Sequence, residues 1–155
     1  MSFDEARDVT VLFGGAGGGT YSQETWTWNG ANWTLQSPPS SPSPRYQHGM
    51  VYDSERQVVV LFGGHGGSTL GDTWEWNGTT WTARPEAGPP ARLQPGIAYD
   101  SDRGVTVLFG GQSGPTMLND TWEWDGNAWT NKGPGPGART GCALAYDPDR
   151  AVTVM

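Results

Sequence analysis

The chain has 155 residues, including 24 Gly, 12 Pro and 9 Trp, and a formal net charge of −7. This many aromatic residues argue against disorder, and the acidic charge argues against nucleic acid or an anionic membrane as a partner. Cys142 is the single cysteine, so no disulfide forms within the chain. Abundant Gly together with abundant Trp is typical of short strands joined by tight turns, and we expect an all-β fold.

Nothing in the sequence indicates where the protein resides. Residues 1–15 lack the basic start and the apolar run of a signal peptide. No apolar stretch is long enough to span a bilayer. The localisation is therefore left open.

An internal repeat organises the whole chain. The period is 47 to 49 residues, and it is shared by Gly pairs, two series of Trp, one Arg and an aromatic-Asp pair. The repeating positions are Gly14-Gly15, Gly63-Gly64 and Gly110-Gly111; Trp26, Trp74 and Trp122; Trp33, Trp81 and Trp129; Arg45, Arg92 and Arg139. Several residue types with one period predict repeated structural units.

The units follow one another in chain order. Residues 1–36 hold the end of a first strand (A) and then strands B to D. Residues 45–84 and 92–131 hold two complete units, and residues 139–155 hold strands A and B of another, with A over 140–146 and B over 152–155. The chain thus forms one segment of three units and a remainder.

The middle unit illustrates the four predicted strands. Strand A covers 47–52 and strand B covers 58–62, where β-branched residues dominate. A Gly-rich loop over 65–71 leads to strand C over 73–76, in which alternation places both Trp on one face. Asn77-Gly78 is a strong hairpin signal, and strand D begins at Trp81.

These residues resemble the kelch-repeat family, whose blade type also forms the galactose oxidase propeller. The family signature is a double Gly, then an aromatic residue, then a Trp after six intervening residues, as in Gly63-Gly64, Trp74 and Trp81. Trp replaces the family's usual Tyr at the aromatic position, and a second Trp follows two residues later. This extended pattern is more similar to bacterial members than to animal adaptor proteins.

The resemblance implies a β-propeller of four-stranded blades, with three blades in this chain. Propellers use roughly four to eight blades, so three cannot close alone. Two copies would make a six-bladed homodimer, in which strand A of residues 140–146 lies beside the partner's first strand B and Arg139 approaches Glu24. Residues 152–155 would then be displaced, disordered or paired elsewhere. Alternatively, a longer natural array supplies the missing blades.

Most repeated residues are expected to be structural. All nine Trp are interpreted as core-filling, and the Gly pairs as points of close backbone approach. The Arg that opens strand A and the acid that opens strand C lie at the same end of a unit. The sequence therefore predicts that Arg45 pairs with Asp72 and Arg92 with Asp120.

The sequence offers little for catalysis. His48 and His65 are the only histidines, and the copper site of galactose oxidase would need two His, two Tyr and a Cys crosslink. Cys142 lies in a strand. The acidic turns, such as residues 53–56, fit Asx turns better than calcium loops, and residues 14–19 lack a P-loop Lys. We expect no enzyme activity, cofactor or metal.

Strand direction puts the variable B–C loops and the D–A links on one face. Loops on a rigid scaffold commonly carry recognition, so this face is the candidate binding site. Its distinctive side chains are Tyr21, His65, Gln112 and Met117. The leading hypothesis is a non-enzymatic module that binds a protein or polymer. The alternatives are a carbohydrate-binding, lectin-like propeller and a fragment of a galactose oxidase-like protein.

Overall fold

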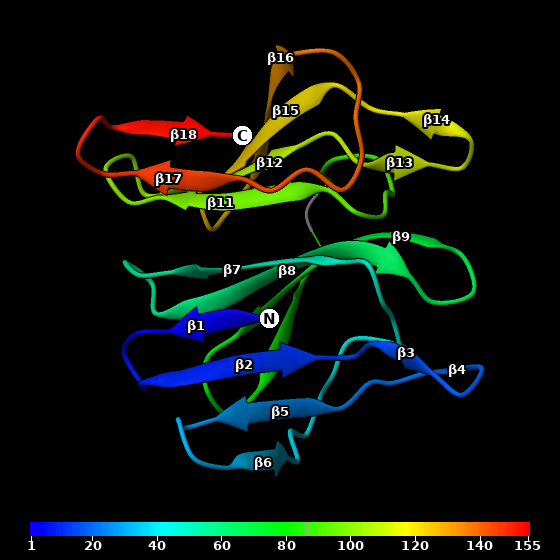
Figure 1. Ribbon diagram of the computed structural model, residues 1–155, viewed down its shortest axis with the longest axis vertical. Coiled ribbons are helices and arrows are strands. Elements are labelled where there is room, and N and C mark those ends of the chain that lie inside the picture. Colours follow the sequence, from blue (N-terminus) through cyan, green and yellow to red (C-terminus); the bar gives the residue numbers. More distant parts are fainter. Residues whose placement is uncertain (86) are drawn as a thin grey trace.

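The computed structural model describes residues 1–85 and 87–155, in which every regular element is a β-strand (Figure 1). The all-β prediction is confirmed. Three antiparallel sheets of four strands each follow one another along the chain. Within the described residues, no helix is long and apolar enough to cross a membrane.

The strands of each sheet are consecutive in sequence apart from the small loop hairpins. Sheet 1 contains β1 (Ser2–Asp4), β2 (Val9–Phe13), β5 (Thr25–Trp28) and β6 (Trp33–Gln36). Sheet 2 contains β7 (Gly49–Asp53), β8 (Val58–His65), β9 (Thr69–Trp76) and β10 (Trp81–Arg84). Sheet 3 contains β11 (Gly96–Asp100), β12 (Val105–Phe109), β15 (Asp120–Trp124) and β16 (Trp129–Pro134).

Three two-stranded ladders complete the fold. They are β3 (Ala16–Gly17) with β4 (Thr20–Tyr21), β13 (Gln112–Ser113) with β14 (Thr116–Met117), and β17 (Ala145–Asp147) with β18 (Val152–Val154). The first two belong to the connections between the second and third strands of sheets 1 and 3. The last lies beyond sheet 3, next to β11 (Figure 1).

Several predicted strand boundaries differ from the structure by a few residues, and two of the differences have a clear cause. In sheet 2 the ladder resumes after a bulge between Phe62 and Gly64, so β8 and β9 extend into residues expected to be loop. Near the C-terminus, β17 is shorter than the strand expected over 140–146. Gly141 has φ +67 there, and its N–H donates to the Gln94 carbonyl at 3.0 Å, which keeps this stretch out of the ladder.

Adjacent sheets stack face to face, and alternation along β8 supplies both contacts. Val59 and Leu61 of sheet 2 join a buried cluster with sheet 1. Val60 and Phe62 point the other way and join a cluster with sheet 3. Each fully buried side chain of this size contributes about 2 kcal/mol through removal from water.

Tryptophans dominate both clusters, as expected of core-filling residues. Trp76 and Trp81 are 1% and 2% exposed between sheets 1 and 2, and Trp124 and Trp129 are 0% and 7% exposed between sheets 2 and 3. Trp74 also packs at the edge of the first cluster, so the two Trp of β9 share one face as predicted. The two buried interfaces are thus built from the same repeated positions.

Tight turns close one end of every sheet. The N–H of Arg56 donates to Asp53 Oδ1 at 2.9 Å, and the Arg56 guanidinium pairs with the other oxygen of that carboxylate. Asp100 and Arg103 repeat this arrangement at 3.1 Å. The geometry is that of the expected Asx turns with an internal counter-charge.

Candidate binding site

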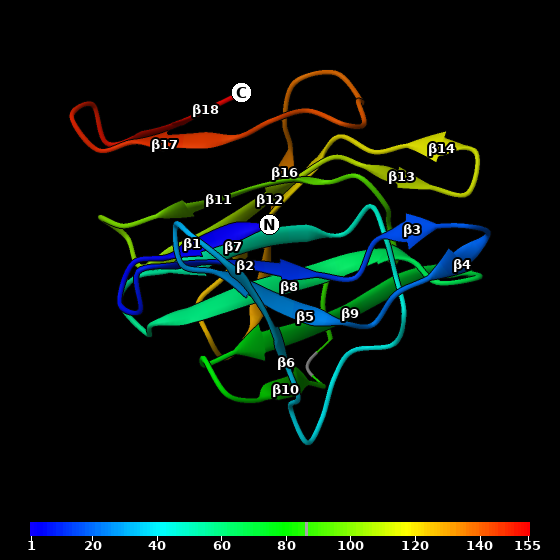
Figure 2. The same cartoon turned by 60° about the horizontal axis from the view of Figure 1, so that its bottom comes forward.

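The loops that connect the second and third strands lie together at one end of the sheets, which we call the loop end. It comprises β3–β4, the end of the β8–β9 hairpin, and β13–β14, while the turns between first and second strands lie at the opposite, turn end (Figure 1). A view rotated by 60° also keeps β3–β4 and β13–β14 on one side (Figure 2). The loops therefore share a face, as strand direction predicts.

The Gly pair and the repeated Arg hold each loop at its base. Gly15, Gly64 and Gly111 donate their N–H groups to the carbonyls of Arg45, Arg92 and Arg139 at 2.8, 2.9 and 2.9 Å. Each Arg belongs to the segment that follows the sheet it contacts. A Cβ added to Gly63, whose φ is +67, would lie 2.5 Å from the Arg92 carbonyl oxygen. This close approach explains why Gly recurs at the position.

The same Arg side chains tie the first strand of a sheet to the third. Arg45 donates to both Asp72 oxygens at 2.6 and 2.8 Å, and Arg92 does so to Asp120 at 2.6 and 2.7 Å. Both predicted pairs are confirmed. The two Arg side chains are fully buried, and each also donates to the carbonyl of the first Gly in its own sheet's pair. The base of each loop is therefore fixed by charge as well as by backbone contacts.

Burial and hydrogen bonding act in opposite directions on these carboxylates. Burial raises the pKa of Asp72, but hydrogen bonds from Arg45 and Trp74 outweigh it and hold that pKa below its ordinary value. The pKa of Asp120 is lowered in the same way by Arg92 and Trp122. Both carboxylates are thus held charged beside their Arg partners at neutral pH.

An aromatic cluster occupies the loop end between sheets 1 and 2. The ring of Tyr21 stacks on Tyr46 with centroids 5.2 Å apart, and His65 meets both rings edge-on at 5.9 and 5.5 Å. Tyr46 and His65 are also joined by two backbone hydrogen bonds of 3.0 and 2.9 Å. Tyr21 remains 40% exposed. The cluster therefore presents the exposed ring of Tyr21 at the loop end, supported from behind by Tyr46 and His65.

The other two predicted residues lie together elsewhere on this end. Gln112 and Met117 face each other across the β13–β14 ladder, and Met117 is 55% exposed. The Gln112 Nε2 donates to the Gly114 carbonyl at 2.8 Å. The backbone of Gln112 forms an isolated antiparallel β-bridge with Leu93, as that of His65 does with Tyr46. The four predicted residues thus form two pairs, Tyr21 with His65 and Gln112 with Met117.

Sequence reasoning missed Tyr46. The residue after the repeated Arg is Tyr46, Leu93 or Thr140, so the aromatic character does not recur. The available signal was its position directly after Arg45, at the entry to a strand that begins at the loop end.

The remaining candidate residues do not form a catalytic constellation. Residues 1–85 and 87–155 contain no group of three or more His, Cys, Asp or Glu side chains able to hold a metal ion. His48 is half-buried and lies edge-on to Phe13 at 5.8 Å, apart from His65 in the exposed cluster. Burial first, then the nearby N-terminus and Arg45, lowers the pKa of His48 to about 3. Cys142 is a half-buried free thiol.

Neither models of protein families nor curated proteins give a match to this chain. The class defined by the fold is a stack of four-stranded antiparallel sheets with a shared loop end.

Proposed function

We propose that this chain is a kelch-type β-propeller segment that acts as a non-enzymatic binding or scaffold module. In this proposal sheets 1 to 3 are three blades, and β17–β18 are the first two strands of another. Support comes from the two sheet interfaces, which repeat the same Trp, Thr and Phe contacts. Four antiparallel strands per repeat of just under 50 residues is the composition of a propeller blade.

We further propose that the loop end recognises a protein or polymer partner. The observation that carries this proposal is the cluster of Tyr21, Tyr46 and His65, because one of its rings is exposed while the others back it. Exposed Tyr supplies a large contact area at low entropic cost, which suits recognition. The backbone and Arg contacts beneath the loops make this surface rigid before binding.

A screen of the immobilised chain against a peptide display library tests the proposal. We expect ligands whose affinity falls about five- to thirtyfold in Tyr21→Ser, since one aromatic contact is worth about 1–2 kcal/mol at an interface. Phe3→Ser is the matched control, because Phe3 is a half-exposed aromatic residue in β1, which leads to the turn end. The proposal fails if selected ligands are lost in the Phe3 variant and kept in the Tyr21 variant.

The stacked Tyr pair also favours a second candidate, binding of a carbohydrate. Tyr21 and Tyr46 are only 19° from parallel, and an exposed tyrosine ring offers a flat apolar face with a polar tip. A glycan array distinguishes the two candidates. Sugar binding that disappears in Tyr21→Ser would support the lectin-like alternative over the peptide ligand.

An oxidase fragment is the weakest candidate. It would need two His, two Tyr and a Cys converging on copper, and here Cys142 follows sheet 3 while the Tyr21, Tyr46 and His65 cluster lies between sheets 1 and 2. Elemental analysis of the purified chain after copper addition tests this alternative directly.

A further inference from the structure

The outer faces of sheets 1 and 3 carry the two halves of a contact that the structure makes twice inside. At each internal interface a Trp indole donates to a Thr hydroxyl of the preceding sheet: Trp81 to Thr25 and Trp129 to Thr73, both at 2.9 Å. The same Trp meets a Phe of the preceding sheet edge-on, at 5.2 and 5.3 Å. A complete contact therefore needs a Trp on one side and a Thr and a Phe on the other.

Sheet 1 presents the Trp half to solvent. Trp28 and Trp33 lie 5.5 Å apart and tilted by 41°, nearly the geometry of Trp76 with Trp81 at 5.5 Å and 40°. Trp33 is nevertheless 45% exposed, and Leu35 beside it on β6 is 48% exposed. The pair is thus already arranged as in the buried interfaces.

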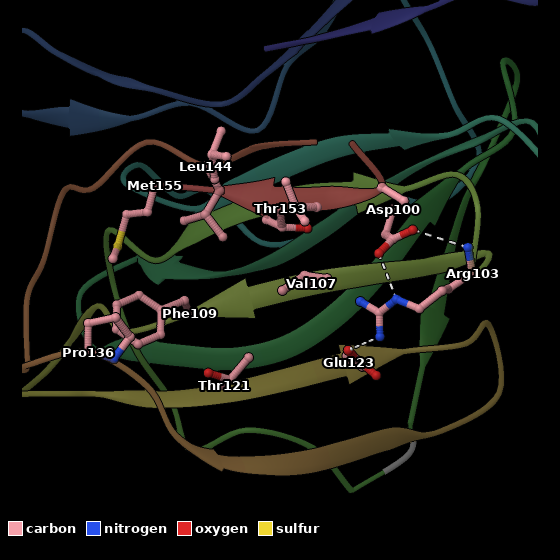
Figure 3. A pocket seen from close by; sticks show the side chains of 13 residues that line it. Asp100, Arg103, Val107, Phe109, Thr121, Glu123, Pro136, Leu144, Thr153 and Met155 are labelled. Atoms are coloured by element: carbon pink, nitrogen blue, oxygen red, sulfur yellow. Dashed lines mark hydrogen bonds and ion pairs between the residues drawn. The ribbon is translucent and has the colours of Figure 1, made fainter. Parts of the chain in front are cut away.

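Sheet 3 presents the receiving half. A cavity of about 440 Å³ lies between its outer face, where Val107, Phe109, Thr121 and Glu123 line it, and the C-terminal residues 151–155 (Figure 3). Phe109 and Thr121 hold the repeat positions of Phe13 and Thr25. Glu123 holds the position of Glu75, whose Oε1 accepts from the Trp124 indole at 3.0 Å.

Arg139 and Glu24 correspond to the two partners of the internal Arg–Asp ion pairs. The Arg139 Nε donates to the carbonyl two residues back at 2.9 Å, as Arg45 and Arg92 do at 3.0 and 3.1 Å. Among the described residues Arg139 has no carboxylate partner. Glu24 accepts from the Trp26 indole at 2.9 Å, as Asp72 does from Trp74 at 2.7 Å, and lacks an Arg partner in the same described part. Arg139 and Glu24 thus hold the poses of the two partners in the internal pairs.

We propose that a second copy of this chain docks its sheet 1 on the outer face of sheet 3. Trp33 of the second copy would then donate to Thr121 and pack on Phe109, and its Glu24 would pair with Arg139. Made twice about a two-fold axis, this contact joins two sets of three sheets into a closed ring of six, within the roughly four to eight blades of propellers. The inference does not depend on what the loop end binds.

The β17–β18 hairpin must move for the second copy to dock. It contacts β11 on the side where β1 and β2 of the second copy would lie. Its strands have three residues each, and Val152, Val154 and Met155 are 43%, 44% and 50% exposed. The β1–β2 hairpin of sheet 1 is the stronger element, because Asp4 and Val11 in it are fully buried, whereas β17 and β18 contain no fully buried residue. Docking by displacement therefore needs no strand exchange between the copies.

Charge-swap variants test the proposal by sedimentation equilibrium. We expect the full chain to be a dimer, and Arg139→Glu and Glu24→Arg each to weaken the dimer at least about tenfold through two like-charge contacts. Mixing the two variants should restore it, because the heterodimer has one swapped ion pair and one original pair. A folded monomer at about 100 µM wild-type chain, well above the Kd of an interface of standard size, overturns the proposal. A mixture that stays monomeric does so too.

Three further variants sharpen the result. Glu55→Arg makes the same charge change as Glu24→Arg at an exposed turn, and the dimer should be unaffected. Thr121→Val should weaken the dimer about fivefold or more without changing the stability of the monomer, whereas Thr25→Val should do the reverse. Thr153→Pro removes a pairing of the hairpin and should strengthen the dimer. A weaker dimer in Thr153→Pro, or a wild-type species larger than a dimer, contradicts the proposed displacement and closure.

Discussion

Trp81 and Trp33 occupy the same position in successive repeats, yet Trp81 is 2% exposed and Trp33 is 45% exposed. Their sheets have the same strand order, and each Trp pairs in register with the last Trp of the preceding strand. The difference is the neighbour: sheet 1 covers Trp81, and no described residue covers Trp33 in the same way. The repeat thus determines the position of a side chain, whereas its contribution to stability depends on the adjacent sheet.

The largest effect expected from this comparison is on the Trp pair itself. Trp81→Ala should lower the free energy of unfolding by about 3–5 kcal/mol, since it opens a cavity and leaves Thr25 without its donor. Trp33→Ala should cost less than about 1 kcal/mol in dilute solution, as for other exposed sites. Urea unfolding of both variants checks this. Equal losses would mean that Trp33 is covered in the monomer.

The repeated Arg offers a second comparison. Arg92→Ala should cost about 2–3 kcal/mol, because Asp120 and the Gly110 carbonyl both lose a buried donor. Arg139→Ala should cost less than about 0.5 kcal/mol in the monomer, because the Arg139 side chain is exposed. Thermal unfolding separates the two variants. An unchanged melting temperature in Arg92→Ala would show that the buried ion pair adds nothing to stability.

The second Gly of each pair allows two costs of a Gly→Ala substitution to be measured separately: that of the backbone conformation and that of a close approach to a neighbouring carbonyl. Gly64 and Gly15 both have positive φ, +98 and +115. A Cβ on Gly64 would lie 2.7 Å from the Tyr46 carbonyl oxygen, whereas one on Gly15 meets nothing within 4 Å. Gly15→Ala should cost about 1 kcal/mol for its backbone conformation alone, and Gly64→Ala at least about 2 kcal/mol. Equal costs in urea unfolding would exclude the close approach as the reason for Gly64.

The sequence predicted the structural features that are formed by repeated residues, but not those that occur in a single unit. Residue types repeated in three units predicted the sheets, the Asx turns and the Arg45–Asp72 and Arg92–Asp120 pairs, because the same chemistry must satisfy the same geometry each time. Tyr46 occurs in one unit only, so no pattern pointed to it. The extension of β8 past Phe62 depends on a bulge, which the Gly pair permits but does not specify.

The sequence predicted where the candidate site lies but not which of its side chains contact one another. Strand direction located the loop end correctly. Consecutive antiparallel strands run in opposite directions, so every second connection lies at the same end of the sheet. It did not reveal that Tyr21 of one loop meets His65 of the next, since that contact depends on how two sheets stack. The exposure of Trp33 was missed for the same reason.

His48 provides the effect most specific to a single neighbour. Its equivalents in the next two units are Pro95 and Cys142, so a histidine occupies this position only between sheets 1 and 2. The ring lies beside Phe13, and Nδ1 has no hydrogen-bond partner among the described residues. Burial is the main cause that lowers its pKa from 6.5 to about 3.

A lowered pKa means that the folded chain keeps His48 neutral while the unfolded chain binds a proton. The stability contributed by this group is therefore complete above pH 6.5 and is lost as the pH falls toward 3. One proton corresponds to about 1.4 kcal/mol per pH unit. Between about pH 6.5 and 5.5, above the range where carboxylates with ordinary pKa values near 4 titrate, His48→Gln should flatten the dependence of the unfolding free energy on pH. The slope is the informative quantity, because the Gln side chain also alters the contact with Phe13. A slope that survives in His48→Gln would mean that His48 is hydrated in solution and is not the source of this pH dependence.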